Sequence, residues 1–284
     1  MEDFVGMHKD TRQNFGTIAR VYADRAVRQP GCEMRRHHSH EYYELYYLEQ
    51  GFCRFLIDDR LYDLREGDFA LIPPRVFHHS QYAQGVCRRV TVYFRREDVT
   101  AEALEWLPGG EAFLDRAQVF HVGQSYREPV AALVGRMVAE SKTDDRHSGM
   151  LLYWQLQELL VLCRRCCDFS QEAPEAIPTG DHQVLLAARF IAENYMRTLT
   201  AADIAAAAGF SPNYLSRRFR QVTGVSIHEY LVFTRLHHAA EQLVTTGDTI
   251  TQIALRCGFS GSNYFKDAFK KKYGVTPREY RNEQ

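Results

Sequence analysis

Apolar and polar residues follow two different periods along the chain. From residue 21 to about residue 94, short runs rich in Tyr, Phe, Val and Ile alternate with charged turns such as Asp58-Asp59. Such runs are typical of short strands, and several at this spacing predict a small antiparallel barrel or jelly roll. Apolar residues then recur at helical spacing in residues 129–141 and 150–167, which predicts two amphipathic helices.

The C-terminal part of the chain repeats one pattern twice. The first copy holds Gly209-Phe210-Ser211, Tyr214-Leu215, Phe219, Gly224-Val225 and Tyr230, and the second holds Gly258-Phe259-Ser260, Tyr264-Phe265, Phe269, Gly274-Val275 and Tyr280. The offset is 49 residues at the start and 50 after one inserted residue. A repeat of this period indicates one structural unit used twice.

Each copy predicts a helix, a tight turn and a second helix. In the first copy, Thr200 is a typical N-cap residue, and Gly209 ends the helix where a left-handed conformation costs least. Ser211-Pro212 then opens a helix in which Leu215 and Phe219 face the core. Because the second helix of each copy also carries exposed polar and basic residues, the pattern is that of two helix-turn-helix units.

The distribution of charge favours nucleic-acid binding by the C-terminal part. The whole chain has a net charge of -1, but residues 182–284 hold 13 Lys and Arg against 8 Asp and Glu. The remaining residues hold 22 basic against 28 acidic side chains. A basic part joined to an acidic one suits phosphate binding by the basic part alone and argues against a plain helical bundle.

Cysteine usage and hydropathy predict a cytoplasmic protein that does not cross a membrane. The start, Met1-Glu2-Asp3, is acidic and is not followed by the long apolar run of a signal peptide. No stretch reaches the roughly 20 apolar residues of a membrane span. The 7 cysteines suit a reducing compartment, and the cluster Cys163, Cys166 and Cys167 is interpreted as helix packing in preference to a redox or metal site.

A group of metal-ligand residue types lies within the β-rich part. His38, His40 and Glu44 share parity, so on one strand all three side chains would point the same way. His78 follows on a later strand. Two histidines and a glutamate on one strand, with a third histidine from a neighbour, form a plausible site for a divalent transition metal such as Zn, Ni, Mn or Fe.

The inward face of the same strand continues with Tyr42, Tyr46 and Leu48. A tyrosine gives a pocket both apolar area and a hydroxyl, which suits a polar effector such as a sugar, whereas Leu48 is interpreted as barrel core. The effector site is therefore predicted at His38, His40, Tyr42, Glu44, Tyr46 and His78.

Residues 182–281 resemble the DNA-binding domain of the AraC family of bacterial transcription regulators. The resemblance rests above all on the second repeat, which carries Ile253-Ala254, Gly258-Phe259-Ser260, Tyr264-Phe265, Phe269-Lys270, Gly274-Val275-Thr276-Pro277 and Tyr280-Arg281. It implies two helix-turn-helix units joined by a long helix over about residues 228–244. It also implies that both recognition helices enter successive major grooves, roughly 34 Å apart on one face of the DNA.

By the same resemblance, the early exposed positions of each recognition helix read bases. These are Asn213, Ser216 and Arg217 in the first unit, and Ser262, Asn263, Lys266 and Asp267 in the second. Arg can bond guanine, Asn can bond adenine, and Asp can accept from the cytosine amino group. Many relatives have a basic or small residue at the position of Asp267. Three roles stay open for Asp267: reading a cytosine, avoiding phosphate, or pairing with Lys271. Phosphate contacts are expected from Arg218, Arg220, Arg235, Lys270 and Lys271.

The spacing of histidines and glycines in the β-rich part resembles the two motifs of the cupin superfamily. His38, His40, Glu44 and His78 stand at the four metal-ligand positions. Arg75 occupies a position where many cupins have Gly, so the turn after Pro73 is open to change, and the doublet His78-His79 leaves open which ring faces inward. AraC-type sensors often keep such a motif while binding an organic effector, so a metal site and a hydrogen-bonding effector pocket both stay open.

The sequence as a whole predicts an α+β protein of two domains, a cupin-type jelly-roll barrel followed by an all-α domain with two helix-turn-helix motifs. Residues 1–125 are expected to bind the effector, 126–167 to form a helical dimerisation segment, 168–181 a linker, and 182–284 the DNA-binding domain. The resemblance implies a homodimeric, sequence-specific regulator, an activator of a catabolic operon, with double-stranded DNA, a small polar effector and RNA polymerase as partners. The alternative is a cupin metalloenzyme or metal sensor fused to a DNA-binding domain, although the sequence shows no dedicated acid–base partner for an enzyme.

Overall fold

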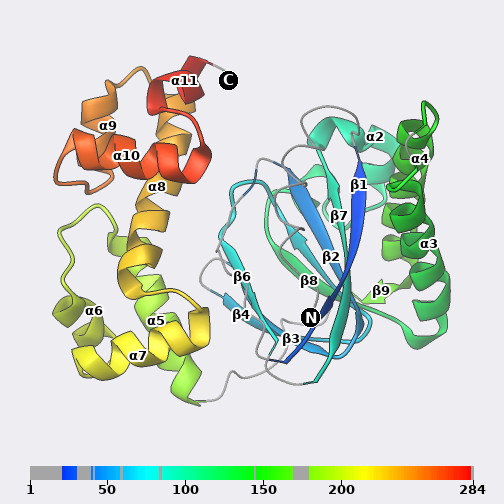
Figure 1. The fold of residues 1–284 in the computed structure, drawn as a ribbon, viewed down its shortest axis with the longest axis horizontal. Coiled ribbons are helices and arrows are strands. Elements are labelled where there is room, and N and C mark those ends of the chain that lie inside the picture. Colours follow the sequence, from blue (N-terminus) through cyan, green and yellow to red (C-terminus); the bar gives the residue numbers. More distant parts are fainter. Residues whose placement is uncertain are drawn as a thin grey trace, which may run out of the picture. The chain divides into compact units, whose positions relative to one another are not determined.

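A computed structural model describes residues 21–30, 40, 42–57, 60–82, 85–143, 145–168 and 179–282. The chain divides into two compact units, with the main boundary between Glu175 and Ala176. The N-terminal unit is built on β-sheets and the C-terminal unit on helices, which confirms the predicted α+β class (Figure 1). No helix in the described ranges is long and apolar enough to cross a membrane.

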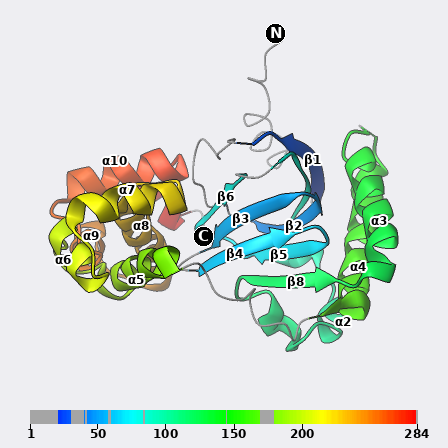
Figure 2. The same cartoon turned by 90° about the horizontal axis from the view of Figure 1, so that it is seen from below.

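Two sheets form the framework of the N-terminal unit. The larger has the strand order β1 (Tyr22–Arg28), β7 (Cys87–Phe94), β2 (Tyr43–Gln50), β5 (Asp68–Ile72), β8 (Gln118–Val122) and β9 (Cys167–Asp168), and the smaller has the order β4 (Arg60–Arg65), β3 (Phe52–Ile57) and β6 (His78–Gln81). The sheets face each other as a sandwich (Figure 2). The predicted cupin-like architecture is confirmed. It takes the form of a sandwich, because no strand pairing among the described residues joins the two sheets into a closed barrel.

The alternation of side chains along β2 divides the N-terminal unit into two layers. Leu45 and Tyr47 point to the outer face of the larger sheet and pack in a core shared with the helices. Tyr46 and Leu48 point between the two sheets and pack in a second apolar cluster. Because side chains repeat their direction every second residue, Glu44 shares this interior face with Tyr46.

Two long helices cover the outer face of the larger sheet. The short segments η1 (Arg96–Asp98), α2 (Ala101–Glu105), η2 (Gly110–Phe113) and η3 (Gln124–Tyr126) precede α3 (Arg127–Glu140) and α4 (Ser148–Cys166), which lie side by side (Figure 2). Both long helices lie close to the ranges that the hydrophobic pattern predicted. Gln157 ties α4 to the sheet-to-helix connection, because its amide donates to the Asp98 carbonyl at 2.7 Å and accepts from the Thr100 N–H at 3.1 Å.

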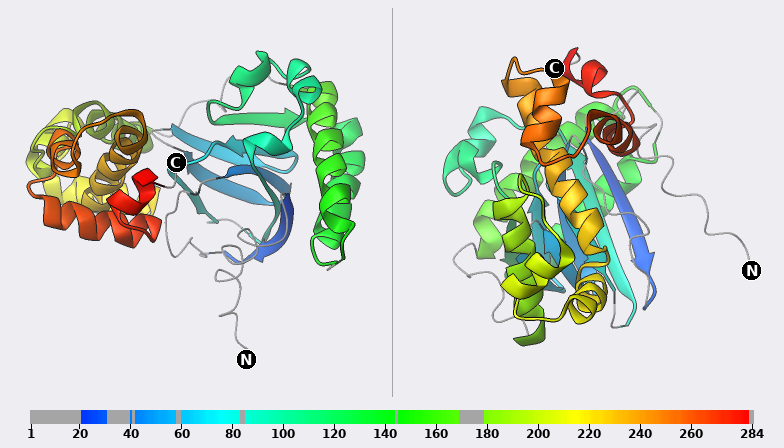
Figure 3. Two further views of the ribbon diagram at one scale, coloured as in Figure 1. Left: turned by 90° about the horizontal axis from the view of Figure 1, so that it is seen from above. Right: turned by 90° about the vertical axis from the view of Figure 1, so that its left-hand side faces the viewer.

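The described part of the C-terminal unit is helical. Its helices are α5 (Thr179–Asn194), α6 (Ala201–Ala207), α7 (Pro212–Thr223), α8 (Ile227–Thr245), α9 (Ile250–Arg256), α10 (Ser262–Tyr273) and α11 (Pro277–Asn282). The long α8 joins the pair α6–α7 to the pair α9–α10, as the family resemblance implied (Figure 3). The sequence interpretation missed α5, although Val184, Ala187, Ala188 and Ile191 are buried at helical spacing. Because α5 begins at Thr179, the end of the predicted linker, residues 168–181, is helical.

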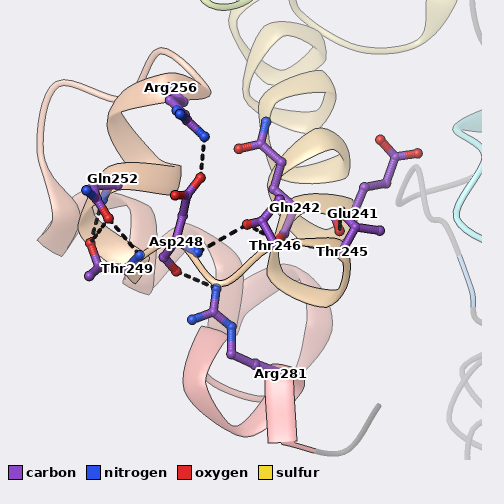
Figure 4. A network of polar contacts seen from close by, with 9 residues as sticks. All are labelled: Glu241, Gln242, Thr245, Thr246, Asp248, Thr249, Gln252, Arg256 and Arg281. Atoms are coloured by element: carbon purple, nitrogen blue, oxygen red, sulfur yellow. Dashed lines mark hydrogen bonds and ion pairs between the residues drawn. The ribbon is translucent and has the colours of Figure 1, made fainter.

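A polar network fixes the connection between α8 and α9 (Figure 4). Thr249 caps α9: its hydroxyl accepts from the Gln252 N–H at 3.2 Å, and the Gln252 side chain accepts from the Thr249 N–H at 2.8 Å. The Asp248 carboxylate pairs with Arg256, and the Asp248 carbonyl accepts from Arg281 Nη2 at 2.7 Å. Arg281 therefore holds α11 against the start of the second helix-turn-helix unit.

The turn glycines of the two repeats offer a matched test of packing. Gly209 and Gly258 have positive φ of 71° and 83°. A Cβ on Gly258 would lie 2.4 Å from the Tyr195 carbonyl oxygen, whereas one on Gly209 meets nothing within 4 Å. We expect Gly209→Ala to lower the free energy of unfolding by about 1–2 kcal/mol, the cost of a left-handed non-glycine residue. Gly258→Ala should cost about 1–3 kcal/mol more, because the backbone must also move. Urea unfolding measures both, and equal losses would contradict the packing difference.

Candidate functional site

The second helix of each repeat presents the residues expected to read bases. Asn213, Ser216 and Arg217 on α7 and Asn263, Lys266 and Asp267 on α10 are exposed, and Ser262 at the start of α10 is half-buried. The opposite faces are buried through Leu215 and Phe219 on α7 and through Phe265 and Phe269 on α10. Each helix thus keeps one face on its own core and leaves the other available to a DNA groove.

Most of the basic residues expected at phosphates also lie at the surface. Arg220 on α7 and Lys270 and Lys271 on α10 are exposed, whereas Arg218 is half-buried and donates to Gln221 at 3.0 Å. A pair of exposed tyrosines that the sequence analysis did not assign lies beside them. Tyr214 and Tyr264 occupy equivalent positions on α7 and α10, and the Arg217 guanidinium lies 5.8 Å from the centre of the Tyr214 ring.

Arg235, which is expected at a phosphate, makes contacts within the C-terminal unit itself. Its Nε donates to the Tyr195 carbonyl at 2.8 Å, and its Nη2 donates to the Arg197 carbonyl at 2.8 Å. The guanidinium also lies over the Phe259 ring. Arg235 therefore ties α8 to the chain that follows α5, and its expected phosphate contact stays a prediction.

A compact polar cluster lies in the interior of the sandwich. His40, Glu44 and His78 are buried, and one ligand atom from each lies within 4.8 Å of the others. Glu44 Oε2 is 2.8 Å from His40 Nε2 and 3.4 Å from His78 Nε2. These are three of the four residues that the sequence grouped as metal ligands; the fourth, His38, lies outside the described residues.

His40 reaches this cluster from a loop, and the strand assigned to it was wrong. Strand β2 begins only at Tyr43, so strand parity does not orient His40. Instead its carbonyl accepts from the Arg75 N–H at 2.7 Å, and its ring stacks on Tyr42 with centroids 4.2 Å apart. Arg75 adopts φ of 68°, the conformation a glycine would take there. Arg75 therefore holds a left-handed position in the turn after Pro73 without a glycine, at a strain of about 1–2 kcal/mol.

The register of β6 decides which of the two adjacent histidines faces inward. Ile57 on β3 pairs with His78, and Leu56 pairs with His79. Ile57 belongs to the interior cluster, so His78 points into the sandwich and His79 points to the other face of the small sheet.

Hydrogen bonds to the backbone determine which ring nitrogen of each histidine carries a proton. His40 Nδ1 lies 2.7 Å from the Tyr42 carbonyl oxygen, and His78 Nδ1 lies 3.1 Å from the Val76 carbonyl oxygen. A carbonyl only accepts, so Nδ1 carries the proton in both rings. A neutral ring then turns the lone pair of Nε2 toward the Glu44 carboxylate. That arrangement is favourable when a proton or a metal ion lies between them.

The surroundings favour the charge states that bind a metal. Burial alone would raise the pKa of Glu44, but its interactions with the adjacent His40 and His78 rings outweigh burial and hold this pKa well below its usual value. Burial lowers the pKa of His40, although the Glu44 hydrogen bond opposes the shift. An ionised carboxylate beside two histidine rings is a donor set that suits a divalent Zn, Ni, Mn or Fe ion.

Aromatic and hydroxyl groups share the same interior. The hydroxyl of Tyr46, a residue expected at the effector site, lies 3.4 Å from that of Tyr82, which accepts from Ser80 Oγ at 3.1 Å. Tyr42 is half-buried beside His40. Ser80, Tyr82, Arg89 and Tyr93 were not predicted as residues of this interior. Ser80 and Tyr82 share parity with His78, and Arg89 shares parity with Tyr93 on β7, which were the available signals.

A β-sandwich with a buried polar cluster, in one chain with two tandem helix-turn-helix units, defines a ligand-binding transcription regulator. Two family models match this division: an AraC-like ligand binding domain over residues 25–160 and a helix-turn-helix domain over residues 204–283. The chain belongs to the AraC family of transcription regulators.

Relatives match along most of the chain. The HTH-type transcriptional activator RhaS of Klebsiella pneumoniae (strain 342) is 26% identical over 260 residues, which cover 89% of this chain and 90% of that protein. The HTH-type transcriptional activator RhaR of Yersinia pestis bv. Antiqua (strain Angola) is 27% identical over 247 residues, covering 86% and 83%. Among solved structures, the C-terminal domain of AraT, a response regulator from Geobacillus stearothermophilus, is 37% identical and covers 36% of this chain and 85% of that one, with a TM-score of 0.35.

Metal content tests the buried cluster directly. In protein purified without chelators or a His tag, we expect about one equivalent of a divalent transition metal, because three buried donors converge on one point. His78→Ala and Glu44→Gln should each abolish it, whereas His79→Ala, the neighbour on the opposite face of β6, should retain it. Elemental analysis of folded protein measures all four samples. A metal-free parent protein would show that the three side chains act only as hydrogen-bonding groups.

Proposed function

We propose that this regulator activates transcription when a small polar effector, a sugar or a related metabolite, binds in the interior of the sandwich. The observation that carries the proposal is the buried cluster of His40, Glu44 and His78 in a unit that one chain joins to two DNA-reading units. The nearby hydroxyls of Tyr46 and Tyr82 add donors and acceptors of the kind that a polyhydroxy ligand needs.

The sign of regulation and the partners belong to the same proposal. Two relatives that align over most of the chain are named transcriptional activators, which supports activation here. Activation in the cytoplasm would bring the DNA-bound protein next to RNA polymerase. An effector can change that outcome only if it binds two arrangements of the protein with unequal affinity. Binding without turnover suffices for this role, so the chain need not be an enzyme.

Helix α4 supports homodimer formation. Its exposed side carries Met150 and Trp154, which are 61% and 59% exposed, together with Leu151. Apolar side chains this large are uncommon at a solvated helix surface and mark a face suited to a second copy. A dimer would bind two half-sites through a raised effective concentration.

A metal sensor is the second candidate function, and the histidine geometry favours it. In both rings Nδ1 is hydrogen-bonded to a backbone carbonyl oxygen, and Nε2 lies near the same carboxylate oxygen. If metal is the effector, affinity for DNA will depend on metal without any organic ligand. A cupin metalloenzyme shares this donor set, but turnover would additionally require an acid–base group at the substrate.

A matched pair of variants tests DNA reading. Arg217→Ala, at an exposed early position of α7, should lower affinity for the operator by about 1–3 kcal/mol and relax base preference at one position. Lys271→Ala, at the exposed end of α10, should weaken operator and random DNA alike and reduce the salt dependence by about one phosphate contact. Selection from a random DNA library, followed by titration in several salt concentrations, measures both effects. Equal loss on specific and random DNA in both variants would contradict the base-reading assignment.

A second pair tests the dimer. Trp154→Glu places a charge on the exposed face of α4 and should convert the dimer to a monomer, because a charge at the centre of an apolar interface is left without a partner. Trp106→Glu alters a tryptophan of similar exposure, 63%, that follows α2 and should leave the dimer intact. Sedimentation velocity over a range of concentrations distinguishes the two. A monomeric parent protein, or a dimer in both variants, would remove α4 from the interface.

A further inference from the structure

A buried arginine lies in the same interior as the polar cluster, and neither the family match nor the cluster accounts for it. Arg89 is on β7 and is 7% exposed. Side chains on β7 alternate, so Arg89 shares the interior face with Thr91 and Tyr93, whereas Val90 and Val92 pack on the helix side. The preceding Arg88 is exposed and donates to Gln50 at 2.9 Å.

The guanidinium of Arg89 has few strong acceptors in the part of the chain that the structure describes. It donates to the Thr91 hydroxyl, lies 6.0 Å from the centre of the Tyr46 ring, and has Asp24 Oδ2 as its nearest carboxylate oxygen at 3.7 Å. A guanidinium carries five N–H donors, and a buried one costs several kcal/mol unless a well-placed anion compensates. A hydroxyl and a carboxylate beyond hydrogen-bond distance supply only part of that compensation.

The carboxylate nearest to this guanidinium is itself partly exposed to solvent. The side chain of Asp24 is 25% exposed, while that of Arg89 is 8% exposed. Asp24 lies on β1, whose residues pair with those of β7. An incoming carboxylate that takes the place of the distant Asp24 contact can form the two parallel hydrogen bonds that suit a guanidinium.

The strand register places Arg89 and the His40–Glu44–His78 cluster along one line. Leu48 pairs with Arg89, Tyr46 with Thr91, and Glu44 with Tyr93 across β2 and β7. Because Arg89 extends to Thr91, about two residues, or roughly 7 Å, separate its guanidinium from the Glu44 row. That spacing is comparable to the length of a monosaccharide, so one ligand could contact both groups.

The hydroxyls of two tyrosines lie in the same interior as Arg89 and the polar cluster. Burial raises the pKa of both Tyr46 and Tyr82, so both phenols stay protonated and can donate as well as accept. The interior therefore offers a fixed positive charge at one end, hydroxyls beside it, and a carboxylate with two imidazoles at the other end.

We propose that the effector is a sugar acid, a polyhydroxy monocarboxylate whose carboxylate pairs with Arg89 and whose hydroxyls face the His40–Glu44–His78 cluster. The inference rests on the proposed function, since it names the chemical class of the effector in the same interior. A neutral sugar of equal size would leave Arg89 with only the distant Asp24 carboxylate and would therefore bind less tightly.

Matched acid and neutral ligands test this on the full chain. The probes are D-galacturonate against D-galactose, D-glucuronate against D-glucose, and D-gluconate against sorbitol, each followed by thermal shift and by calorimetric titration. At least one acid should raise the melting temperature and bind about ten- to a hundredfold more tightly than its neutral partner, because a hydrogen-bonded charge pair is lost in the neutral one.

Variants of adjacent residues assign the effect to Arg89. Arg89→Gln should remove the preference for the acid, and Arg89→Lys, which keeps the charge but not the two-pronged geometry, should retain part of it. Arg88→Gln, on the opposite face of the same strand, should bind like the parent. If Arg89→Gln does not fold, the contrast between Arg89→Lys and Arg88→Gln decides. An acid that binds Arg89→Gln as tightly as the parent protein overturns the proposal.

The same titrations separate failure of this inference from failure of the proposed function. If a neutral sugar binds and changes affinity for operator DNA while every acid is inert, the acid assignment is wrong and the sugar-responsive regulator stands. If neither arm changes protein stability or DNA affinity, both the acid assignment and the sugar effector are rejected, and the metal sensor is the surviving function.

Discussion

The pairing of β2 with β7 is the constraint on which the N-terminal unit depends. Each strand alternates between two environments, so a single register places Leu45 beside Val92 on the helix side and Glu44 beside Tyr93 in the interior. A shift of one residue would exchange every inward and outward side chain on the shifted strand. Glu44 would then face the apolar helix core without His40, at a cost of several kcal/mol for an unpaired buried charge. Polar binding groups and core packing are thus specified by the same strand contacts.

The helices of the C-terminal unit begin at local capping signals, so their positions can be predicted from the sequence. Capping boxes at Thr200, Ser226 and Thr249 begin three helices, and each involves a partner three residues away. Yet the two repeats are not equivalent. The turn at Gly258 packs against the Tyr195 carbonyl, whereas the turn at Gly209 is open. The second unit is also tied to α11 through Arg281. The two copies of the repeat therefore differ in how their turns and ends are held by the rest of the C-terminal unit.

The sequence predicted features that local periodicity encodes and missed those that need tertiary register. Helices α3 and α4 follow from spacing, and so does the burial of Leu215 and Phe219 on one face of α7, whereas α8 was implied by the family resemblance. His40 was placed on a strand because parity suggested it, whereas a loop held by the Arg75 N–H brings it to Glu44. The backbone contacts of Arg235 were not predicted, because its two carbonyl partners lie 40 and 38 residues away along the chain and leave no local signal. Arg89 went unnoticed for the same reason: its burial follows from cross-strand pairing.

Strands β2 and β7 also provide a physical route from the interior to the helices. Tyr46 and Arg89 lie on one face of these strands, while Tyr47 and Val90 on the other face pack in the core that includes α3 and α4. Close-packed cores resist small changes in spacing, so a ligand that draws Arg89 away from Asp24 acts on the same backbone that supports α4. The free energy available for such a change is limited to the difference in ligand affinity between the two arrangements. The interaction energy of two charges depends steeply on their separation. A buried arginine that exchanges a distant carboxylate for a close one therefore gives the two arrangements different affinities for the ligand.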